Sequence, residues 1–385
     1  MLTLAAFFVA LGFGVMIPVL PIFGRSFGVS NFLVGVVISA FAGMRLLTSP
    51  FCPRINLALG ERNAITAGML IVAASSVAAG MAHSYAELLI WRALGGIGSA
   101  MFTVAAMALL LASAPPELRG RAAGLYQGGF LLGGMAGPAI GGALAGISLT
   151  APFFFYAGTL GAAAATSHFL LPKGQRALAH EASAGRSFSA VASDVRYQAA
   201  CVSAFAQGWT SFGVRASLVP VLIVEGLHQA PSVSGTVFAI AAVAQTAVLL
   251  PVGTAVDRLG RKPVMIAAGL ITGLSAAAAP FAPSVWILTA VLCLYGIGSA
   301  AQGTAPTAAV GDVVGGRGGS GIAVFSMMTD VGAITGPLVA GWLADKAGMP
   351  AAFAVGAAFL LAGSIYSFFI PKEAHAQAAE RTRES

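Results

Sequence analysis

Runs of about twenty apolar residues recur along almost the whole of this 385-residue chain, separated by short polar connections. A helix of about twenty residues crosses the hydrocarbon core of a bilayer, because each residue adds about 1.5 Å. Only 9% of the residues are charged and 58% are hydrophobic, whereas soluble domains contain about 25% charged residues. The pattern predicts an all-α membrane protein and excludes a soluble globular enzyme.

The apolar runs predict twelve transmembrane helices, with a polar, Ser- and Ala-rich segment between the sixth and the seventh. The spans are expected near residues 2–24, 31–51, 63–82, 86–112, 120–146, 151–171, 199–224, 232–255, 263–282, 285–311, 319–344 and 351–370. The predicted organisation is an N-terminal six-helix bundle (1–171), a cytoplasmic linker (172–198), a C-terminal six-helix bundle (199–371) and a cytoplasmic tail (372–385).

The distribution of basic residues predicts the orientation in the membrane. One set of alternate loops, together with the linker and the tail, is rich in Lys and Arg, whereas the opposite loops contain only Arg25 and Lys346. The positive-inside rule therefore predicts that both termini are cytoplasmic in a multi-pass protein of the inner membrane. This bias accounts for the net charge of +7 without a nucleic-acid partner.

The two halves are copies of each other, offset by about 200 residues. The pentapeptide Gly-Ile-Gly-Ser-Ala occurs at 96–100 and again at 296–300. Further matches at a similar offset are Pro18 with Pro220, Gly35 with Gly235, Gly60 with Gly260, Arg119 with Arg317, and Gly137-Pro138 with Gly336-Pro337. Two pseudo-symmetric bundles around a central substrate site are typical of secondary transporters.

Several of these stretches resemble motifs of the drug–proton antiporters of the major facilitator superfamily. They are the first-span segment 12–21, the fourth-span segment Leu88–Ala100 with Arg92, and a fifth-span antiporter motif comprising Gly133, Gly137, Pro138, Gly141 and Gly142. The resemblance covers all twelve spans. It implies the major facilitator fold, in which the first, fourth, seventh and tenth spans line a cavity.

The segment 253–262 is similar to the signature cytoplasmic loop of that superfamily. The resemblance implies that Asp257, Arg258, Gly260 and Arg261, with Arg119, form a cytoplasmic gate that holds the halves together. The equivalent first-half loop lacks the Asp-Arg pair before its glycine, so we expect the gate to depend mainly on the second copy.

Four charged residues lie in the interior of predicted spans, away from the span ends: Arg45, Arg92, Arg215 and Asp330. Because a charge in hydrocarbon is costly, each is expected to face other helices or a watery cavity. Arg45 and Asp330 lie at a similar depth, and the resemblance places their spans side by side. A structural ion pair and a proton-releasing pair both remain open. We predict that Asp330, with Arg45 and Arg92, couples transport to protons.

We predict a substrate site built from cationic, amide and apolar side chains. Its expected members are Arg92, Arg215, Phe13, Met16, Gln127, Trp209, Phe212, Gln245 and Gln302. The amides have an alternative role as hydrogen bonds between helices. The first span contains no acidic residue, which favours an anionic or neutral substrate over a cation. The sequence contains no metal-ligand spacing, phosphate-binding loop or nucleophile–base set, so we expect no metal, cofactor or enzymatic activity.

The leading hypothesis is proton-coupled efflux of an amphipathic small molecule by alternating access, with the protein acting as a monomer in the lipid bilayer. Proton-coupled uptake of an organic anion is a second hypothesis, which the antiporter motif disfavours. A third is a non-transporting sensor on a transporter scaffold. We would expect such a sensor to carry a sizeable soluble domain, which these 385 residues do not contain.

Overall fold

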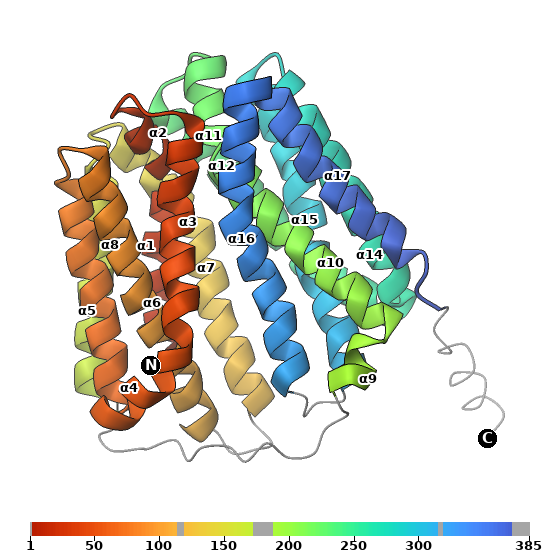
Figure 1. The fold of residues 1–385 in the computed structure, drawn as a ribbon, viewed down its shortest axis with the longest axis horizontal. Helices are drawn as coiled ribbons and strands as arrows, with labels where there is room; N and C mark the ends of the chain where they lie inside the picture. Colours follow the sequence, from red (N-terminus) through yellow and green to blue (C-terminus); the bar gives the residue numbers. More distant parts are fainter. Residues whose placement is uncertain (1, 114–118, 172–187, 315–318, 372–385) are drawn as a thin grey trace.

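The computed structural model describes residues 2–113, 119–171, 188–314 and 319–371, and every regular element in these ranges is a helix (Figure 1). The first half contains α1 (Leu2–Met16), α2 (Leu20–Arg25), α3 (Asn31–Thr48), η1 (Ser49–Phe51), α4 (Cys52–Leu59), α5 (Glu61–Gly80), α6 (Tyr85–Ser113), α7 (Arg119–Ala145) and α8 (Ala151–Leu170). The second half contains α9 (Phe188–Ala192), α10 (Val195–Thr210), η3 (Ser211–Ala216), α11 (Val219–Val221), η4 (Leu222–Gly226), α12 (Pro231–Ala247), α13 (Leu249–Leu259), α14 (Arg261–Ala278), η5 (Ala279–Phe281), α15 (Val285–Val314), α16 (Gly319–Ala347) and α17 (Met349–Ser367).

Nine helices within the described ranges are long and apolar enough to cross a membrane. They correspond to the second to fifth and the eighth to twelfth predicted spans. The other three predicted spans coincide with α1 and α2, with α8, and with the series from α10 to η4. The predicted tail (372–385) and the linker residues 172–187 lie outside the described ranges.

The first and seventh spans are both irregular, and their matched prolines lie at the irregularities. Pro18 lies in the turn 17–19 that separates α1 from α2. Pro220 lies in the short helix α11, between the two π-helical segments η3 and η4. Proline has no backbone N–H to donate, so it interrupts the regular hydrogen-bond ladder of a helix. The internal duplication is therefore visible in the structure as well as in the sequence.

Gly60 and Gly260 have the same structural role in the two halves. Each separates two consecutive helices, and their φ angles are +78° and +87°. Side chains with a Cβ rarely adopt such angles, so these turns require glycine. We call the end of the molecule with these turns the lower end, and the end with Arg25 and Asp345 the upper end, as in Figure 1.

The two halves meet along two helix pairs, α3 with α16 and α7 with α12 (Figure 1). A Cβ added to Gly35 of α3 would collide with the carbonyl of Pro337 in α16. A Cβ added to Gly235 of α12 would likewise collide with the carbonyl of Pro138 in α7. The residue numbers of these two contacts differ by 200 and 199, so the interface between the halves is itself pseudo-symmetric.

The antiporter motif in α7 packs against two different helices. Gly133, Gly137 and Gly141 lie against the backbone of α1, where added Cβ atoms would overlap Phe7, Gly14 and Val15. Gly142 instead faces Gly235 of α12 in the other half. The glycine spacing predicted close helix packing, and the structure confirms it on both faces of α7.

Polar contacts join the halves at the upper end. Arg25 donates two hydrogen bonds to Glu225, with Nε–Oε1 and Nη2–Oε2 distances of 2.8 and 2.9 Å. These hydrogen bonds raise the pKa of the Arg25 guanidinium, against the opposing effect of partial burial. Asp345 accepts hydrogen bonds from the backbone N–H groups of Asn31 and Phe32, at 3.0 and 2.8 Å. An acid of the second half therefore caps the first turn of α3 in the first half.

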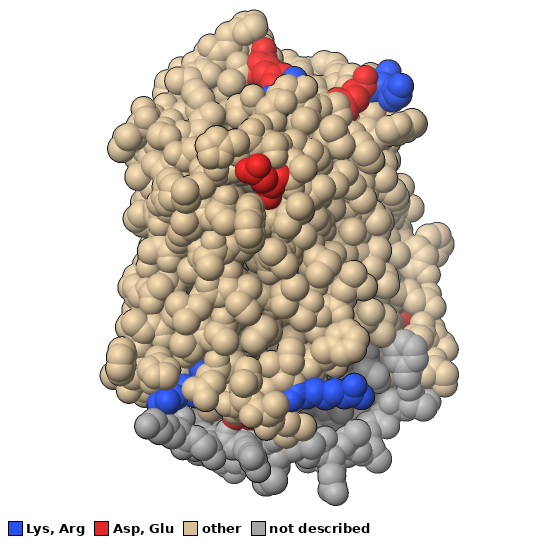
Figure 2. Space-filling model, turned by 60° about the vertical axis from the view of Figure 1, so that its left-hand side comes forward, with Lys and Arg blue, Asp and Glu red and all other residues tan. Residues whose placement is uncertain are grey.

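Further down, Ser39 donates a hydrogen bond to the Ile334 carbonyl, and Arg45 contacts Asp330. Among the described residues, the Arg45–Asp330 contact is the lowest hydrogen bond between the halves. The face in Figure 2 carries a broad uncharged belt, with basic residues along its lower edge, acidic and basic residues at its upper edge, and one acidic group in its upper third. This distribution matches a protein whose middle lies in lipid.

Candidate functional site: a central cavity between the halves

A cavity lies between the two halves and consists of two adjoining compartments. The first has a volume of about 490 Å³ and is lined mainly by the first half. The second has a volume of about 550 Å³ and is lined mainly by the second half. Both compartments are lined by Phe13, Ile17, Phe130, Gly134, Phe212 and Ala216. Each volume lies within the range of pockets that bind drug-sized molecules, about 300–1,000 Å³.

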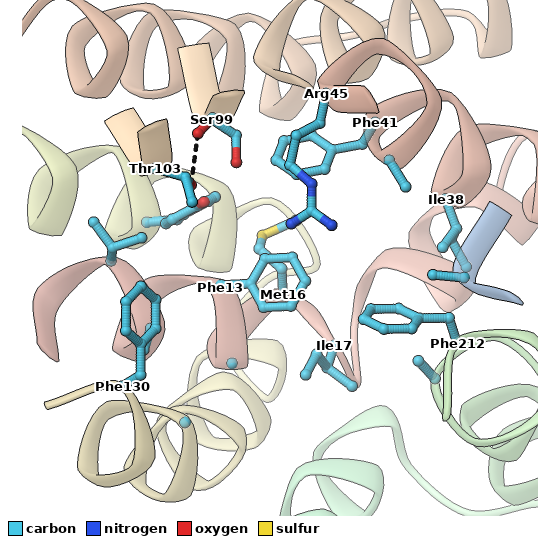
Figure 3. A pocket seen from close by; sticks show the side chains of 18 of the residues that line it. Phe13, Met16, Ile17, Ile38, Phe41, Arg45, Ser99, Thr103, Phe130 and Phe212 are labelled. Atoms are coloured by element: carbon cyan, nitrogen blue, oxygen red, sulfur yellow. Dashed lines mark hydrogen bonds between the residues drawn. The ribbon is translucent and has the colours of Figure 1, made fainter. Parts of the chain in front are cut away.

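The walls of the first compartment are largely aromatic and aliphatic. Figure 3 shows the rings of Phe13, Phe41, Phe130 and Phe212 around this space, with Arg45 extending from α3. Phe13 and Phe41 lie 6.4 Å apart between ring centroids. Ser99 and Thr103 are also present, but the Thr103 hydroxyl donates to the Ser99 carbonyl. This space suits a molecule with an extended apolar body.

Arg92 lines the first compartment from α6 and is only 5% exposed. Its guanidinium carbon lies 4.6 Å from the centroid of the Phe41 ring, a cation–π distance. Gly96, one turn further along α6, packs on the Phe41 carbonyl, so the glycines bring α6 close to α3. Among the described residues, the Arg92 Nε atom has no hydrogen-bond partner. The Arg92 guanidinium therefore has an N–H group in the cavity wall that can donate a hydrogen bond.

Arg215 has the corresponding position in the second compartment. It lies on the π-helical segment η3, and its guanidinium carbon is 5.5 Å from the Phe238 ring and 5.8 Å from the Tyr295 ring. Short π segments are frequent at functional sites, because they alter the direction in which side chains point. Gln245, Thr246 and Thr304 line the same compartment. Each half therefore contributes one arginine, held against aromatic rings, to its own compartment.

The ion pair predicted between the second and eleventh spans is present. Arg45 Nη2 lies 2.5 Å from Asp330 Oδ1, and the two side chains are 35% and 29% exposed. Arg45 also lines the first compartment. The pair joins the halves close to the cavity, where water reaches both side chains.

Two predicted substrate residues do not line the cavity. Trp209 is 1% exposed and packs against Phe359 with a centroid distance of 5.3 Å. The π-helical segment begins at Ser211, two residues after Trp209. Phe212, which belongs to this segment, lines the cavity, whereas Trp209 does not. Gln302 is 4% exposed within α15, while its neighbour Gly303 lines the second compartment. One residue is a rotation of about 100° on a helix, which turns Gln302 away.

The other predictions for this site have mixed outcomes. Phe13, Met16, Phe212 and Gln245 line the cavity as expected. The side chains of Gln127 and Arg119 lie outside the described part of the structure. Sequence reasoning missed several lining side chains: Phe41, Tyr126, Phe130, Tyr156 and Phe238. Phe41 has a usable signal, because it precedes Arg45 by four residues and so lies on the same face of α3.

The predicted cytoplasmic gate residues 257–261 lie at the lower end. Among the described residues, they form no hydrogen bond or ion pair with the other half. Arg261 instead pairs with Asp312 of its own half, with an Nε–Oδ2 distance of 2.8 Å. Asp257 and Arg258 are exposed, and the described residues provide no hydrogen bond to Asp257. The role of this gate stays a prediction.

Two pseudo-symmetric helical halves that enclose a cavity with buried cations define a secondary transporter architecture. A family model described as Major Facilitator Superfamily matches residues 2–209 and 200–385. The chain therefore belongs to the major facilitator superfamily and is a multi-pass membrane protein.

Among curated proteins, the chain is 34% identical over 169 residues to multidrug resistance protein 2 of Bacillus subtilis, covering 44% of this chain and 42% of that protein. It is 30% identical over 155 residues to the quinolone resistance protein NorA of Staphylococcus aureus, covering 40% of each. The matched region thus spans less than half the length of these relatives.

Among solved structures, a bacterial homologue of the human lysosomal transporter Spinster, in an inward-facing and occupied conformation, has a TM-score of 0.75 at 17% identity, covering 96% of this chain and 95% of that one. The human organic anion transporter MFSD10 has a TM-score of 0.67 at 18% identity, covering 95% and 97%. At these identities the similarity shows a shared fold.

Proposed function

We propose that this protein exports an amphipathic, anionic small molecule across the cytoplasmic membrane in exchange for protons. The observation that carries the proposal is the charge of the cavity. Its described lining includes Arg45, Arg92 and Arg215 and no Asp or Glu. A cavity of this composition favours an acidic substrate, because an anion offsets the cost of enclosing the buried Arg92 and the half-buried Arg45 and Arg215 guanidinium groups.

Export is supported by the names of the relatives. A multidrug resistance protein and a quinolone resistance protein match about two fifths of the chain. Quinolones are flat aromatic carboxylic acids, a chemical class that suits an aromatic cavity with arginines. Polar contacts join the halves at the upper end, and the basic loops lie at the lower end. Because the positive-inside rule places basic loops in the cytoplasm, this arrangement supports a conformation that takes up substrate from the cytoplasm.

Proton coupling would use the Arg45–Asp330 pair. In this proposal a proton from outside neutralises Asp330, the contact with Arg45 breaks, and the two halves separate along α3 and α16. Deprotonation of Asp330 towards the cytoplasm restores the pair. An acid that alternately pairs and protonates, in contact with water, is a means of linking proton movement to a change of state.

The test is transport by purified protein in lipid vesicles with an imposed pH gradient, using a quinolone as the substrate. We expect Asp330→Asn, which mimics the protonated acid, to lose stimulation by the gradient while still exchanging labelled for unlabelled substrate. Glu87→Gln, an exposed acid at the start of α6, is the matched control and should keep its stimulation. Unchanged gradient dependence in Asp330→Asn would refute this assignment. Accumulation in the opposite direction would favour uptake by proton symport.

A further inference from the structure

Two arginines, one from each half, line separate compartments of the cavity. Arg92 lines only the first compartment, and Arg215 lines only the second. The side chains shared by both compartments are mainly apolar and include Phe13, Ile17 and Phe212. Along the cavity the order of surfaces is therefore cationic, apolar and cationic.

Each arginine is fixed in position but lacks an anionic partner. Arg92 is held against Phe41, and Arg215 is held between Phe238 and Tyr295. Ring contacts of this kind occupy the faces of a guanidinium and leave its N–H edges available for hydrogen bonds. Arg45, the third cation of the cavity, already contacts Asp330. Two N–H edges in different compartments are thus available to a ligand.

We infer that the preferred substrate is a diacid: an extended, largely aromatic molecule with an acidic group at each end, one bound by Arg92 and the other by Arg215. This inference rests on the proposed function for the anionic nature of the substrate. A monoacid leaves one guanidinium of the cavity wall, the buried Arg92 or the half-buried Arg215, without a counter-charge, which is costly in a medium of low polarity. A diacid satisfies both and connects the two halves through its apolar body.

The inference predicts an affinity pattern for two matched probes, biphenyl monocarboxylate and the biphenyl dicarboxylate with carboxylates at opposite ends. Binding to purified protein in detergent is measured by calorimetry, without any gradient. We expect the dicarboxylate to bind at least tenfold more tightly and with one molecule per protein, since each charge-assisted hydrogen bond adds about a factor of ten or more. An uncharged biphenyl diamide should bind weakly.

Variants assign the two sites. Arg92→Gln and Arg215→Gln should each reduce dicarboxylate affinity about tenfold. Each should reduce monocarboxylate affinity only about twofold, because the other arginine remains available. Arg92→Lys and Arg215→Lys should keep an intermediate affinity, which separates loss of charge from loss of folding. Arg54→Gln, an exposed lower-end residue, is the charge-matched control and should leave both affinities unchanged.

Three outcomes would overturn the inference: equal affinities of the two probes for the native protein, loss of dicarboxylate affinity in only one of the two glutamine variants, or two dicarboxylates bound per protein. Because binding is measured without transport, the predicted binding pattern in a protein that exports neither quinolones nor the dicarboxylate would refute the proposed function and leave the two-site inference intact. Export of an anionic substrate without the predicted affinity pattern would refute the two-site inference and leave the proposed function intact.

Discussion

The contact between the halves at Gly35 is possible only because glycine has no side chain. The backbone of α3 touches the Pro337 carbonyl at this position, and a Cβ has no space there. Gly43, two turns further along the same helix, has no atom within 4 Å of the corresponding point. The two glycines belong to one helix and differ in whether α16 lies against them.

We therefore expect Gly35→Ala and Gly43→Ala to have opposite effects. Gly35→Ala must displace α3 from α16, and we expect it to reduce transport at least tenfold and to lower the unfolding temperature. Gly43→Ala should keep transport and add up to about 1 kcal/mol of stability, because alanine favours the helix. Thermal unfolding and vesicle transport of both variants provide the measurement. Equal behaviour of the two would show that close packing at Gly35 is dispensable.

At the scale of elements, the upper ends of α3 and α16 form a latch whose sequence pattern occurs twice. Gly341 to Gly348 reads Gly-x-x-x-Asp-Lys-x-Gly, and Gly253 to Gly260 reads Gly-x-x-x-Asp-Arg-x-Gly. Both patterns end on a glycine with positive φ, +85° and +87°. Asp345 of the first pattern caps α3 across the halves, whereas Asp257 of the second is exposed at the opposite end.

We expect Asp345→Asn to open the upper end. A carboxylate at a helix N-terminus contributes about 0.5–2 kcal/mol through capping and the helix dipole, enough to change the balance of two states several-fold. Spin labels on the upper ends of α3 and α16 should report a larger population of long distances in the variant. Lys346→Gln changes the exposed neighbouring charge and should leave the distances as they are. An unaltered distribution in Asp345→Asn would exclude the latch.

The elements were largely predictable from sequence, and most contacts between distant residues were not. Apolar run length is a local property, so the spans follow from it. The pair of Arg45 with Asp330 was expected because the family resemblance places their spans side by side, and the structure contains it. The cap by Asp345 joins residues more than 300 positions apart, and no local pattern identifies its partner. Trp209 was misplaced because the sequence does not reveal where α10 changes to a π-helix.

At the scale of the whole molecule, the glycine contacts that join the halves and most of the side chains that line the cavity are different residues. The two helix pairs that join the halves meet through backbone, at Gly35 with Pro337 and at Gly235 with Pro138. The cavity between them is lined by side chains from both halves. Changes to those side chains should alter which molecules bind, whereas changes at the glycine contacts should affect every substrate alike.

The described cavity lining contains no Asp or Glu and therefore favours an anionic substrate. The charge of that substrate has an electrical consequence for transport. Exchange of an outgoing monoanion for an incoming proton moves two elementary charges in the same electrical direction, and a diacid moves three. Each charge gains about 2.3 kcal/mol per 100 mV of membrane potential. We therefore expect an inside-negative potassium diffusion potential to accelerate efflux at zero pH gradient, and the opposite potential to slow it. An exporter of monovalent cations that exchanges one proton moves no net charge and would not respond. The cell would then drive this transporter chiefly by voltage.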